Sequence, residues 1–133
     1  MRPAVAEVVD SKHAAALHTV LCAVRAALAG ARFLTFDEAG LQRAVAHELD
    51  RHGLAYQREK RFGSRDRVDF FVDGVVLELK VKAPAKAILR QVLRYAEHGD
   101  VRAIVVAGTC HSVLRLPHEV SGKPLYAIHL VSF

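Results

Sequence analysis

Cysteine is scarce in the sequence, and tryptophan and asparagine are absent. The two cysteines among the 133 residues, Cys22 and Cys110, stand far apart and form no CxxC spacing. Isolated cysteines are typical of buried apolar residues in a reducing compartment, and two are too few for a cysteine-based zinc site. The scarcity therefore favours a cytoplasmic protein with free cysteines over one held by a disulfide.

The sequence also lacks a long hydrophobic run. Its most apolar N-terminal stretch, residues 14–30, is interrupted by His18 and Arg25 and is shorter than the roughly 20 residues of a membrane helix. Glu7 and Asp10 precede this stretch, where a secretory signal would carry positive charge. We therefore expect a soluble protein with no membrane partner.

Several enzyme motifs are missing. The eight histidines show neither HxH nor HExxH spacing, Ser112 lacks the glycines of a nucleophile elbow, and there is no glycine-rich phosphate loop. These absences argue against serine hydrolysis and against ATP use by this chain. A length of 133 residues with 52% hydrophobic residues, and no internal repeat, suits one domain with a packed core.

Positive charge is concentrated in the middle of the chain. The sequence has 19 Lys+Arg and 14 Asp+Glu, a net charge of +5. Residues 1–53 and 95–133 are each neutral, whereas residues 54–94 carry ten basic and five acidic side chains, so that 10 − 5 = +5. The middle segment is therefore the candidate for contact with a polyanionic partner.

Hydrophobic periodicity predicts the secondary structure. A first helix is expected near 11–29, ended by Gly30, and a second near 36–52, opened by a capping box at Thr35–Glu38. A third helix begins at Pro84 and has Gly99 as its C-cap, and its buried side comprises Ile88, Leu89, Val92, Leu93 and Ala96. Strands are predicted near 55–62, 67–72, 75–82, 101–107 and 125–131.

This order of elements predicts a mixed α/β fold, with one layer of sheet and helices packed on it. We expect a single domain over 1–133. An N-terminal helical extension, about 1–34, precedes an α-β-β-β-α-β core at about 35–107, and a C-terminal strand extension follows at 108–133.

One hairpin brings two carboxylates together. With Asp73-Gly74 as a two-residue type I′ turn, the cross-strand register places Asp69 directly opposite Glu78. Lys80 lies two residues beyond Glu78 and shares its face of the sheet. Opposed carboxylates repel unless a cation lies between them, and a divalent metal with the Lys80 ammonium would meet that need. The alternative is an ion pair on an exposed sheet face, worth about 0–1 kcal/mol.

The second helix contributes another acid. Glu48 follows Val45 by three residues and Leu41 by seven, so it lies along the apolar stripe. A carboxylate there is costly unless it is paired or metal-bound. We therefore expect Glu48 at the rim of the same acidic cluster. The alternative is an edge residue whose carboxylate reaches solvent.

The third helix carries polar and basic residues at regular spacing. Gln91 and Tyr95 are four residues apart and share one face. A basic residue recurs every fourth position at Lys82, Lys86, Arg90 and Arg94. This stripe is a candidate track for a phosphate backbone, and Arg67 lies in a second basic run before Asp69. The alternatives are a solvated helix face for the basic stripe, and helix surface and core for Gln91 and Tyr95.

Together these residues resemble the PD-(D/E)XK nuclease superfamily. The positions that carry the resemblance are Glu48, Asp69, Glu78-Leu79-Lys80 and Gln91. Residues 36–107 are similar to the family's restriction-endonuclease-like core, and Gln91–Tyr95 looks like the QxxxY motif of its RecB-like exonuclease branch. The sequence departs from the pattern at Val68, where the motif has a proline.

The resemblance implies a small nuclease that uses Mg²⁺, or Mn²⁺ in its place, and acts on DNA rather than RNA. Asp69 and Glu78 would hold the metal, with the backbone carbonyl of Leu79 and with Glu48, and Lys80 would orient or help deprotonate the attacking water. The expected catalytic residues are Glu48, Asp69, Glu78, Lys80 and Gln91. The residues expected to bind nucleic acid are Lys82, Lys86, Arg90, Arg94, Tyr95 and Arg67.

Two other functions remain open at this point. The chain could be a structure-specific endonuclease of the Holliday-junction type, working as a dimer, although QxxxY favours end-processing or single-strand cutting. It could instead be a nucleic-acid-binding module that has kept the fold without catalysis, against which the intact Asp69, Glu78 and Lys80 argue. The apolar stripe of the first helix could cover the sheet or bury itself in a homodimer.

Overall fold

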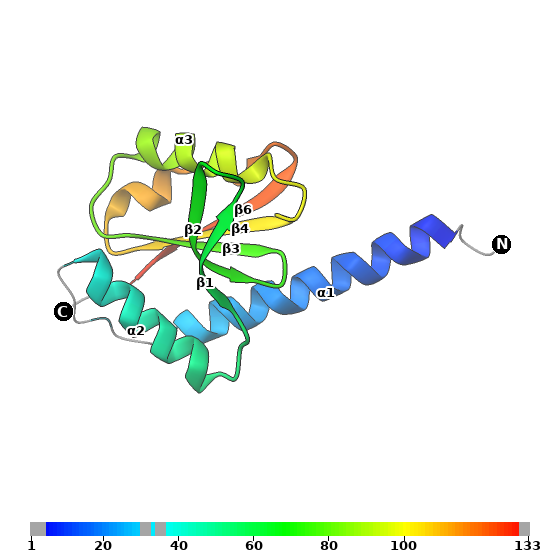
Figure 1. The fold of residues 1–133 in the computed structure, drawn as a ribbon, viewed down its shortest axis with the longest axis horizontal. Helices are drawn as coiled ribbons and strands as arrows, with labels where there is room; N and C mark the ends of the chain where they lie inside the picture. Colours follow the sequence, from blue (N-terminus) through cyan, green and yellow to red (C-terminus); the bar gives the residue numbers. More distant parts are fainter. Residues whose placement is uncertain (1–4, 30–32, 34–36, 131–133) are drawn as a thin grey trace.

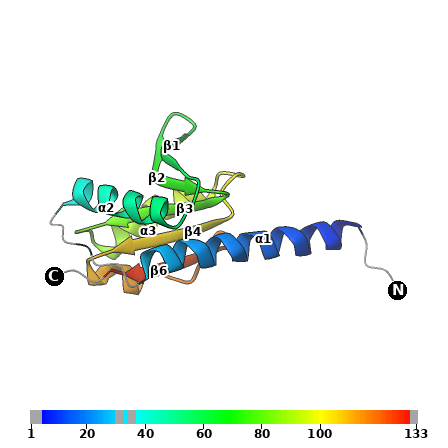
Figure 2. The same cartoon turned by 90° about the horizontal axis from the view of Figure 1, so that it is seen from below.

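The computed structural model describes residues 5–29, 33 and 37–130. The helical spacing of apolar residues in the first third of the chain produces two helices. Helix α1 spans Val5–Leu28 and helix α2 spans Glu38–Arg51. Both lie on the same face of the sheet, and the N-terminal half of α1 extends beyond it (Figures 1 and 2). Within the described residues, no helix combines the length and apolar character needed to cross a membrane.

Both helices begin at residues other than those predicted. Helix α1 already begins at Val5, and neither glycine nor proline lies between Val5 and Ser11 to interrupt it. The N-cap of α2 is Asp37, whose carboxylate accepts a hydrogen bond from the Gly40 N–H at 2.6 Å. The capping box predicted at Thr35 is therefore wrong, and Thr35 itself lies outside the described residues.

The remaining elements follow the predicted order. They are β1 (Gln57–Phe62), β2 (Asp66–Val72), β3 (Val75–Lys80), α3 (Ala85–Ala96), β4 (Ala103–Gly108), a 3₁₀ helix η1 (His111–Arg115), β5 (Glu119–Val120) and β6 (Lys123–His129). The sequence analysis missed η1 and β5, which are too short to show a period. The predicted end of the last strand, Val131, lies outside the described residues.

The strands form one mixed sheet in the order β1-β2-β3-β4-β6-β5. Strands β1, β2 and β3 are antiparallel, β4 and β6 run parallel to β3, and β5 closes the edge antiparallel to β6. Asp73 and Gly74 have φ of +49° and +88°, which confirms the type I′ turn. The predicted register is confirmed for the three pairs Phe70–Leu77, Phe71–Val76 and Val72–Val75.

Helix α3 covers the opposite face of the sheet (Figure 1). Its C-cap is Glu97 and not the predicted Gly99, which does not adopt the left-handed conformation of a glycine cap. Leu93 is 40% exposed, whereas Tyr95 is 1% exposed. Tyr95 lies three residues after the buried Val92, so the two side chains share one face of the helix. Leu93 directly follows Val92 and is turned by about 100° away from that face.

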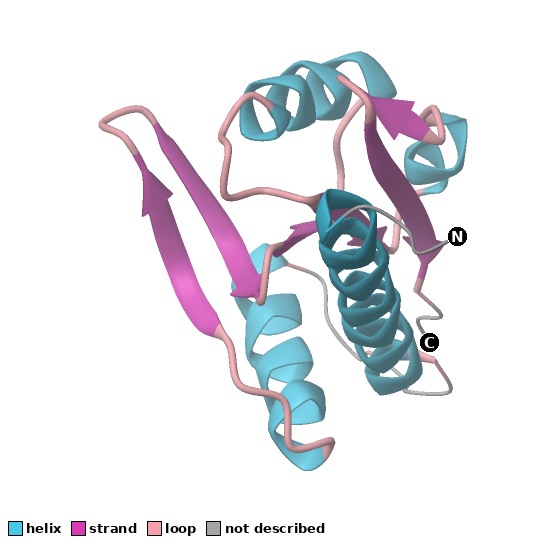
Figure 3. Ribbon diagram, turned by 90° about the vertical axis from the view of Figure 1, so that its right-hand side faces the viewer, coloured by secondary structure: helices cyan, strands magenta, loops and turns pink. Residues whose placement is uncertain are grey.

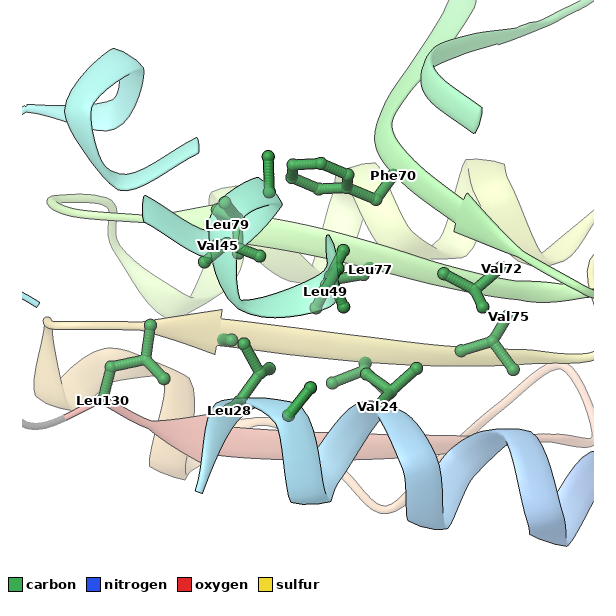
Figure 4. Packing of buried hydrophobic residues seen from close by; sticks show 14 of the residues in the cluster. Val24, Leu28, Val45, Leu49, Phe70, Val72, Val75, Leu77, Leu79 and Leu130 are labelled. Atoms are coloured by element: carbon green, nitrogen blue, oxygen red, sulfur yellow. The ribbon is translucent and has the colours of Figure 1, made fainter. Parts of the chain in front are cut away.

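Two hydrophobic clusters lie on the two faces of the sheet. The first packs α1 and α2 against the sheet, and Figure 4 shows Val24 and Leu28 of α1 with Leu77 and Leu79 of β3. The second packs α3 and η1 against the other face. Both cysteines are free, as predicted, but Cys22 is exposed, because it follows the buried Leu21 and is turned by about 100° from it around α1.

Candidate active site

Five polar side chains from four elements meet where β2 and β3 separate. Asp69 comes from β2, Glu78 and Lys80 from β3, Gln42 from α2 and Tyr95 from α3. Hydrogen bonds and one ion pair connect all five. Asp69, Glu78 and Lys80 are the residues that the sequence analysis placed together.

The hairpin ladder stops just before the two carboxylates. The last Cα partners are Phe70 and Leu77, and side chains take over beyond them. The Asp69 N–H donates to Glu78 Oε1 at 3.1 Å, and the Leu79 N–H donates to Asp69 Oδ2 at 2.8 Å. Each carboxylate thus binds a backbone amide of the other strand, and so satisfies a donor that the ladder leaves unpaired.

Strand β2 rolls over at Asp69. Residues two apart in a strand normally share a face, yet Val68 belongs to the cluster under α3 and Phe70 to the cluster under α1 and α2. Glu59, which occupies the β1 position opposite Asp69, has φ of +53°, a region that non-glycine residues seldom adopt. The roll places the Asp69 carboxylate between the two helical layers, within reach of α2 on one side and of β3 on the other.

Glu78 is buried, and the positive charge near it is too small to keep its carboxylate ionised at neutral pH. Its side chain is 3% exposed, and the nearest cation is the Lys80 Nζ, 3.6 Å from Oε2. Burial, followed by the negative charge of Asp69, raises the pKa of Glu78 to about 8, although Lys80 and the Asp69 N–H act in the opposite direction. In the folded chain without a bound cation, Glu78 therefore carries a proton at neutral pH.

Tyr95 supports Glu78 from within the core. Its hydroxyl lies 3.0 Å from the Arg67 carbonyl and 3.2 Å from Glu78 Oε2, and these two acceptors share its single proton. Burial and then the charge of Glu78 raise the pKa of Tyr95 above its ordinary value, so the hydroxyl keeps its proton. The expectation that Tyr95 contacts nucleic acid is corrected here, since a side chain in the core has no surface to offer.

Gln42 was missed by the sequence analysis. Its Nε2 donates to Asp69 Oδ1 at 3.0 Å, so it holds the carboxylate oxygen that faces α2. The only signal in the sequence is that Gln42 flanks the apolar stripe, three residues before Val45. Glu48 flanks the same stripe three residues after Val45, and nothing in the periodicity chooses between them.

Glu48 does not reach the carboxylates. It lies six residues beyond Gln42, about 9 Å along the helix axis, and its carboxylate pairs with Arg51 at 3.6 Å. Gln91 is half-buried one turn before Tyr95 and makes no side-chain hydrogen bond within the described part of the chain. In the same part of the chain, no group of three His, Cys, Asp or Glu side chains gathers that could hold a metal ion.

Lys80 is fixed through its backbone. Its carbonyl accepts a hydrogen bond from the Thr109 N–H at 3.1 Å, and Gly108 is its Cα partner in β4. A Cβ at position 108 would collide with that carbonyl, so β4 approaches Lys80 closely only because residue 108 is glycine. The side chain of Lys80 is 15% exposed, which leaves its ammonium a narrow path to solvent.

The basic stripe divides into free and paired residues. Three of its members, Lys82, Lys86 and Arg90, are exposed and have no carboxylate within 4 Å among the described residues. Arg94 instead pairs with Asp66, with its Nε 3.1 Å from Oδ1, and is thereby committed to a structural contact. The stripe available to a phosphate backbone is therefore shorter than predicted.

Two carboxylates and a nearby carbonyl fit a hard divalent cation. Each carboxylate oxygen has two lone pairs, so acceptor capacity remains on both Asp69 and Glu78. The Leu79 carbonyl points to the same side of β3 as its N–H, which binds Asp69. Mg²⁺ takes one or two protein carboxylates and keeps several waters, so it needs no third acid.

Comparison of the chain with protein-family models, with curated proteins and with solved structures finds no match. The function therefore has to be inferred from the site itself.

Proposed function

We propose that the chain is a Mg²⁺- or Mn²⁺-dependent nuclease that hydrolyses phosphodiester bonds in DNA, with a restriction-endonuclease-like core of the PD-(D/E)XK type. The observation that carries the proposal is the carboxylate pair of the half-buried Asp69 and the buried Glu78, which has one ammonium within 4 Å, that of Lys80 at 3.6 Å from Glu78. Strongly perturbed acids concentrate at functional sites. The order β1-β2-β3-β4, with α2 and α3 on opposite faces, supports the assignment of the core.

The chain's own residues prepare the site for a phosphate. Asp69, Glu78 and the Leu79 carbonyl would hold a divalent cation, which would supply polarisation of the phosphate and a lowered pKa of the attacking water. Gln42 and Tyr95 hold one oxygen of each carboxylate in place. The Lys80 ammonium then lies where it orients the attacking water and offsets the charge that develops on the phosphate.

Cation binding is coupled to proton release. Glu78, whose pKa is about 8, must lose its proton before both carboxylates can serve as anionic ligands. The affinity for Mg²⁺ should therefore rise with pH up to about 8 and then level off. Calorimetric titration with Mg²⁺ in buffers of different ionisation enthalpy measures the proton released per cation bound.

Nuclease assays with site variants test the proposal directly. Asp69→Ala and Lys80→Ala should abolish Mg²⁺- or Mn²⁺-dependent cleavage of plasmid and linear DNA, with thermal unfolding still cooperative. Asp100→Ala, a matched change at an exposed aspartate, should cleave as the unaltered chain does. Full activity of either purified site variant would sink the assignment.

The choice of substrate separates the narrower possibilities. Linear, circular and branched DNA, each assayed with either metal, distinguish an end-processing nuclease from a junction-specific endonuclease. A chain that binds DNA but neither binds Mn²⁺ nor cuts any of these substrates would be a binding module without catalysis, and the proposed function would be wrong.

A further inference from the structure

We propose that the projecting end of the β1–β2 hairpin is a seat for the phosphate backbone of duplex DNA, next to the bond that is cut. This inference rests on the proposed function, because it names the substrate class of the same site. We call residues 58–62 and 66–68, with the turn between them, the basic ribbon.

The basic ribbon extends past the rest of the sheet. Strand β2 pairs with β3 only over Phe70–Val72, whereas its pairing with β1 continues to the tip, where Phe62 faces Asp66. In Figures 2 and 3 these two strands stand out from the body of the protein. A strand pair that leaves the sheet in this way presents backbone and side chains to a partner.

One face of the basic ribbon is occupied and the other is open. Phe62 and Val68 are buried in the cluster under α3, and the cation of Lys60 lies 5.8 Å from the Phe62 ring centre. Arg61 and Arg67 occupy the alternate positions and are exposed. The ribbon therefore keeps its outer face free for a ligand.

The outer face holds a like-charged pair. Arg61 and Arg67 are direct Cα partners, and neither has a carboxylate within 4 Å among the described residues. Like charges directly opposite each other destabilise a strand pair. An anion between the two guanidinium groups removes that repulsion, and a phosphate diester accepts hydrogen bonds from both. Arg65, exposed in the turn, extends the same charge toward the tip.

The position of the pair relates it to the cutting site. Arg67 lies two residues before Asp69, about 7 Å along a strand, which is comparable to the spacing of neighbouring phosphates on one backbone. The Arg67 carbonyl and Glu78 share the Tyr95 hydroxyl, so the ribbon is tied to the carboxylate pair by a hydrogen bond on each. A backbone held at Arg67 therefore passes the carboxylates.

Duplex DNA fits better than a single strand or duplex RNA. A single strand is bound by stacking its bases on aromatic side chains, yet the one large aromatic residue exposed within the described residues is Tyr126, on β6. Two groups of unpaired cations lie near the carboxylates in the chain, one on the ribbon and one at Lys82, Lys86 and Arg90, and a duplex offers a phosphate backbone to each. The wide major groove of B-form DNA admits a two-stranded ribbon, whereas the major groove of A-form RNA is deep and narrow.

Binding without cleavage tests the inference. In EDTA, the unaltered chain should bind a 20-bp DNA duplex more tightly than single-stranded DNA or an RNA duplex of the same sequence, by fluorescence anisotropy. The double variant Arg61→Gln/Arg67→Gln should lose about 60-fold in duplex affinity at 0.1 M salt, since each phosphate contact contributes about 8-fold there, and its salt slope should fall by about 2. Because both side chains are exposed, its melting temperature should be unchanged or slightly raised.

A matched double variant provides the control. Arg25→Gln/Arg51→Gln removes the same charge from exposed positions on α1 and α2 and should leave duplex affinity within about 2-fold. An equal loss in both double variants, or tighter binding of single-stranded DNA or duplex RNA by the unaltered chain, would overturn the inference. Metal-dependent cleavage by the unaltered chain, together with unchanged duplex affinity in the ribbon variant, means that the proposed function holds and the ribbon seat does not. Ribbon-dependent duplex binding with no cleavage under any metal overturns the proposed function alone.

Discussion

Asp66, and the carboxylate pair of Asp69 and Glu78, each contact one of two neighbouring residues of α3, Arg94 and Tyr95, and the two sites behave in opposite ways. Asp66 accepts from Arg94 at 3.1 Å and lies 2.8 Å from the His98 Nε2. The hydrogen bond with His98, followed by that with Arg94, holds the pKa of Asp66 below its ordinary value. Glu78, beside Asp69, instead has one ammonium within 4 Å, that of Lys80 at 3.6 Å, and the pKa of Glu78 rises to about 8.

The difference separates an acid with two polar partners from a carboxylate pair with one nearby ammonium. Asp66 is buried but fully compensated by its two partners, so it fastens β2 to the end of α3. The carboxylate pair of Asp69 and Glu78 lacks the same compensation, although Arg94 lies directly beside Tyr95 in the chain. Positive charge was available nearby and is used at Asp66, which leaves the pair able to take a cation from solution.

Of the variants considered, Glu78→Gln should have the largest effect on stability and on cleavage. In the folded chain the pKa of Glu78 is about 8 against an ordinary 4.5, so its proton stabilises the fold fully below about pH 4.5. That stabilisation is lost as the pH rises to 8. The variant should remove this slope, raise the free energy of unfolding at pH 8–9 without metal by roughly 3 kcal/mol, and abolish cleavage. Urea denaturation from pH 4 to 9 measures it, and an unchanged slope would contradict the account of Glu78.

Asp66→Asn should act in the opposite direction. The lowered pKa of Asp66 means that its stabilisation is complete above its ordinary value of 3.8 and is lost as the pH falls below it. At pH 7 the variant should lose about 2 kcal/mol, because Arg94 is left without its counter-charge and the hydrogen bond with His98 is weakened. Metal-dependent cleavage should persist at temperatures where the variant is folded. Greater stability at pH 7 would show that Asp66 is not compensated.

Tyr95→Phe tests the link between α3 and the carboxylate pair. The change removes one hydroxyl from the core and should lower the free energy of unfolding by about 1 kcal/mol. Because the hydroxyl stabilises the ionised form of Glu78, the pH dependence of cleavage should move to higher pH. Tyr126→Phe, at an exposed site on β6, is the control and should move neither quantity. An unmoved pH profile in Tyr95→Phe would leave it a packing residue only.

Gln42→Ala should have the smallest effect on stability, below about 1 kcal/mol, because it removes one hydrogen bond between half-buried groups, where water can replace the lost donor. The larger effect of this variant should be on metal binding and catalysis. Its Mn²⁺ affinity and its cleavage rate should each fall several-fold, because the Asp69 carboxylate loses its hydrogen bond from α2. Gln57→Ala, at an exposed position of β1, provides a matched change. Equal Mn²⁺ affinity in both variants would remove Gln42 from the site.

The sequence determined the order of the elements, the type I′ turn, the register around it, and the proximity of Asp69, Glu78 and Lys80. Alternation and turn chemistry act over a few residues, so they can be read directly from the chain. The contribution of α2 could not be read in the same way. Gln42 and Glu48 flank one stripe equally, and only the packing of the helix on the sheet decides which end lies over β2.

Tertiary structure alone decided how the charges are distributed. It buried Tyr95, turned Arg94 to Asp66, and rolled β2 at Asp69 opposite the left-handed Glu59. Each of these depends on contacts between residues distant in the chain, which no local pattern records. The chain therefore carries in its sequence which carboxylates meet. The fold decides that they meet with one ammonium nearby, because Glu78 is buried and Arg94, next to Tyr95, is already paired with Asp66.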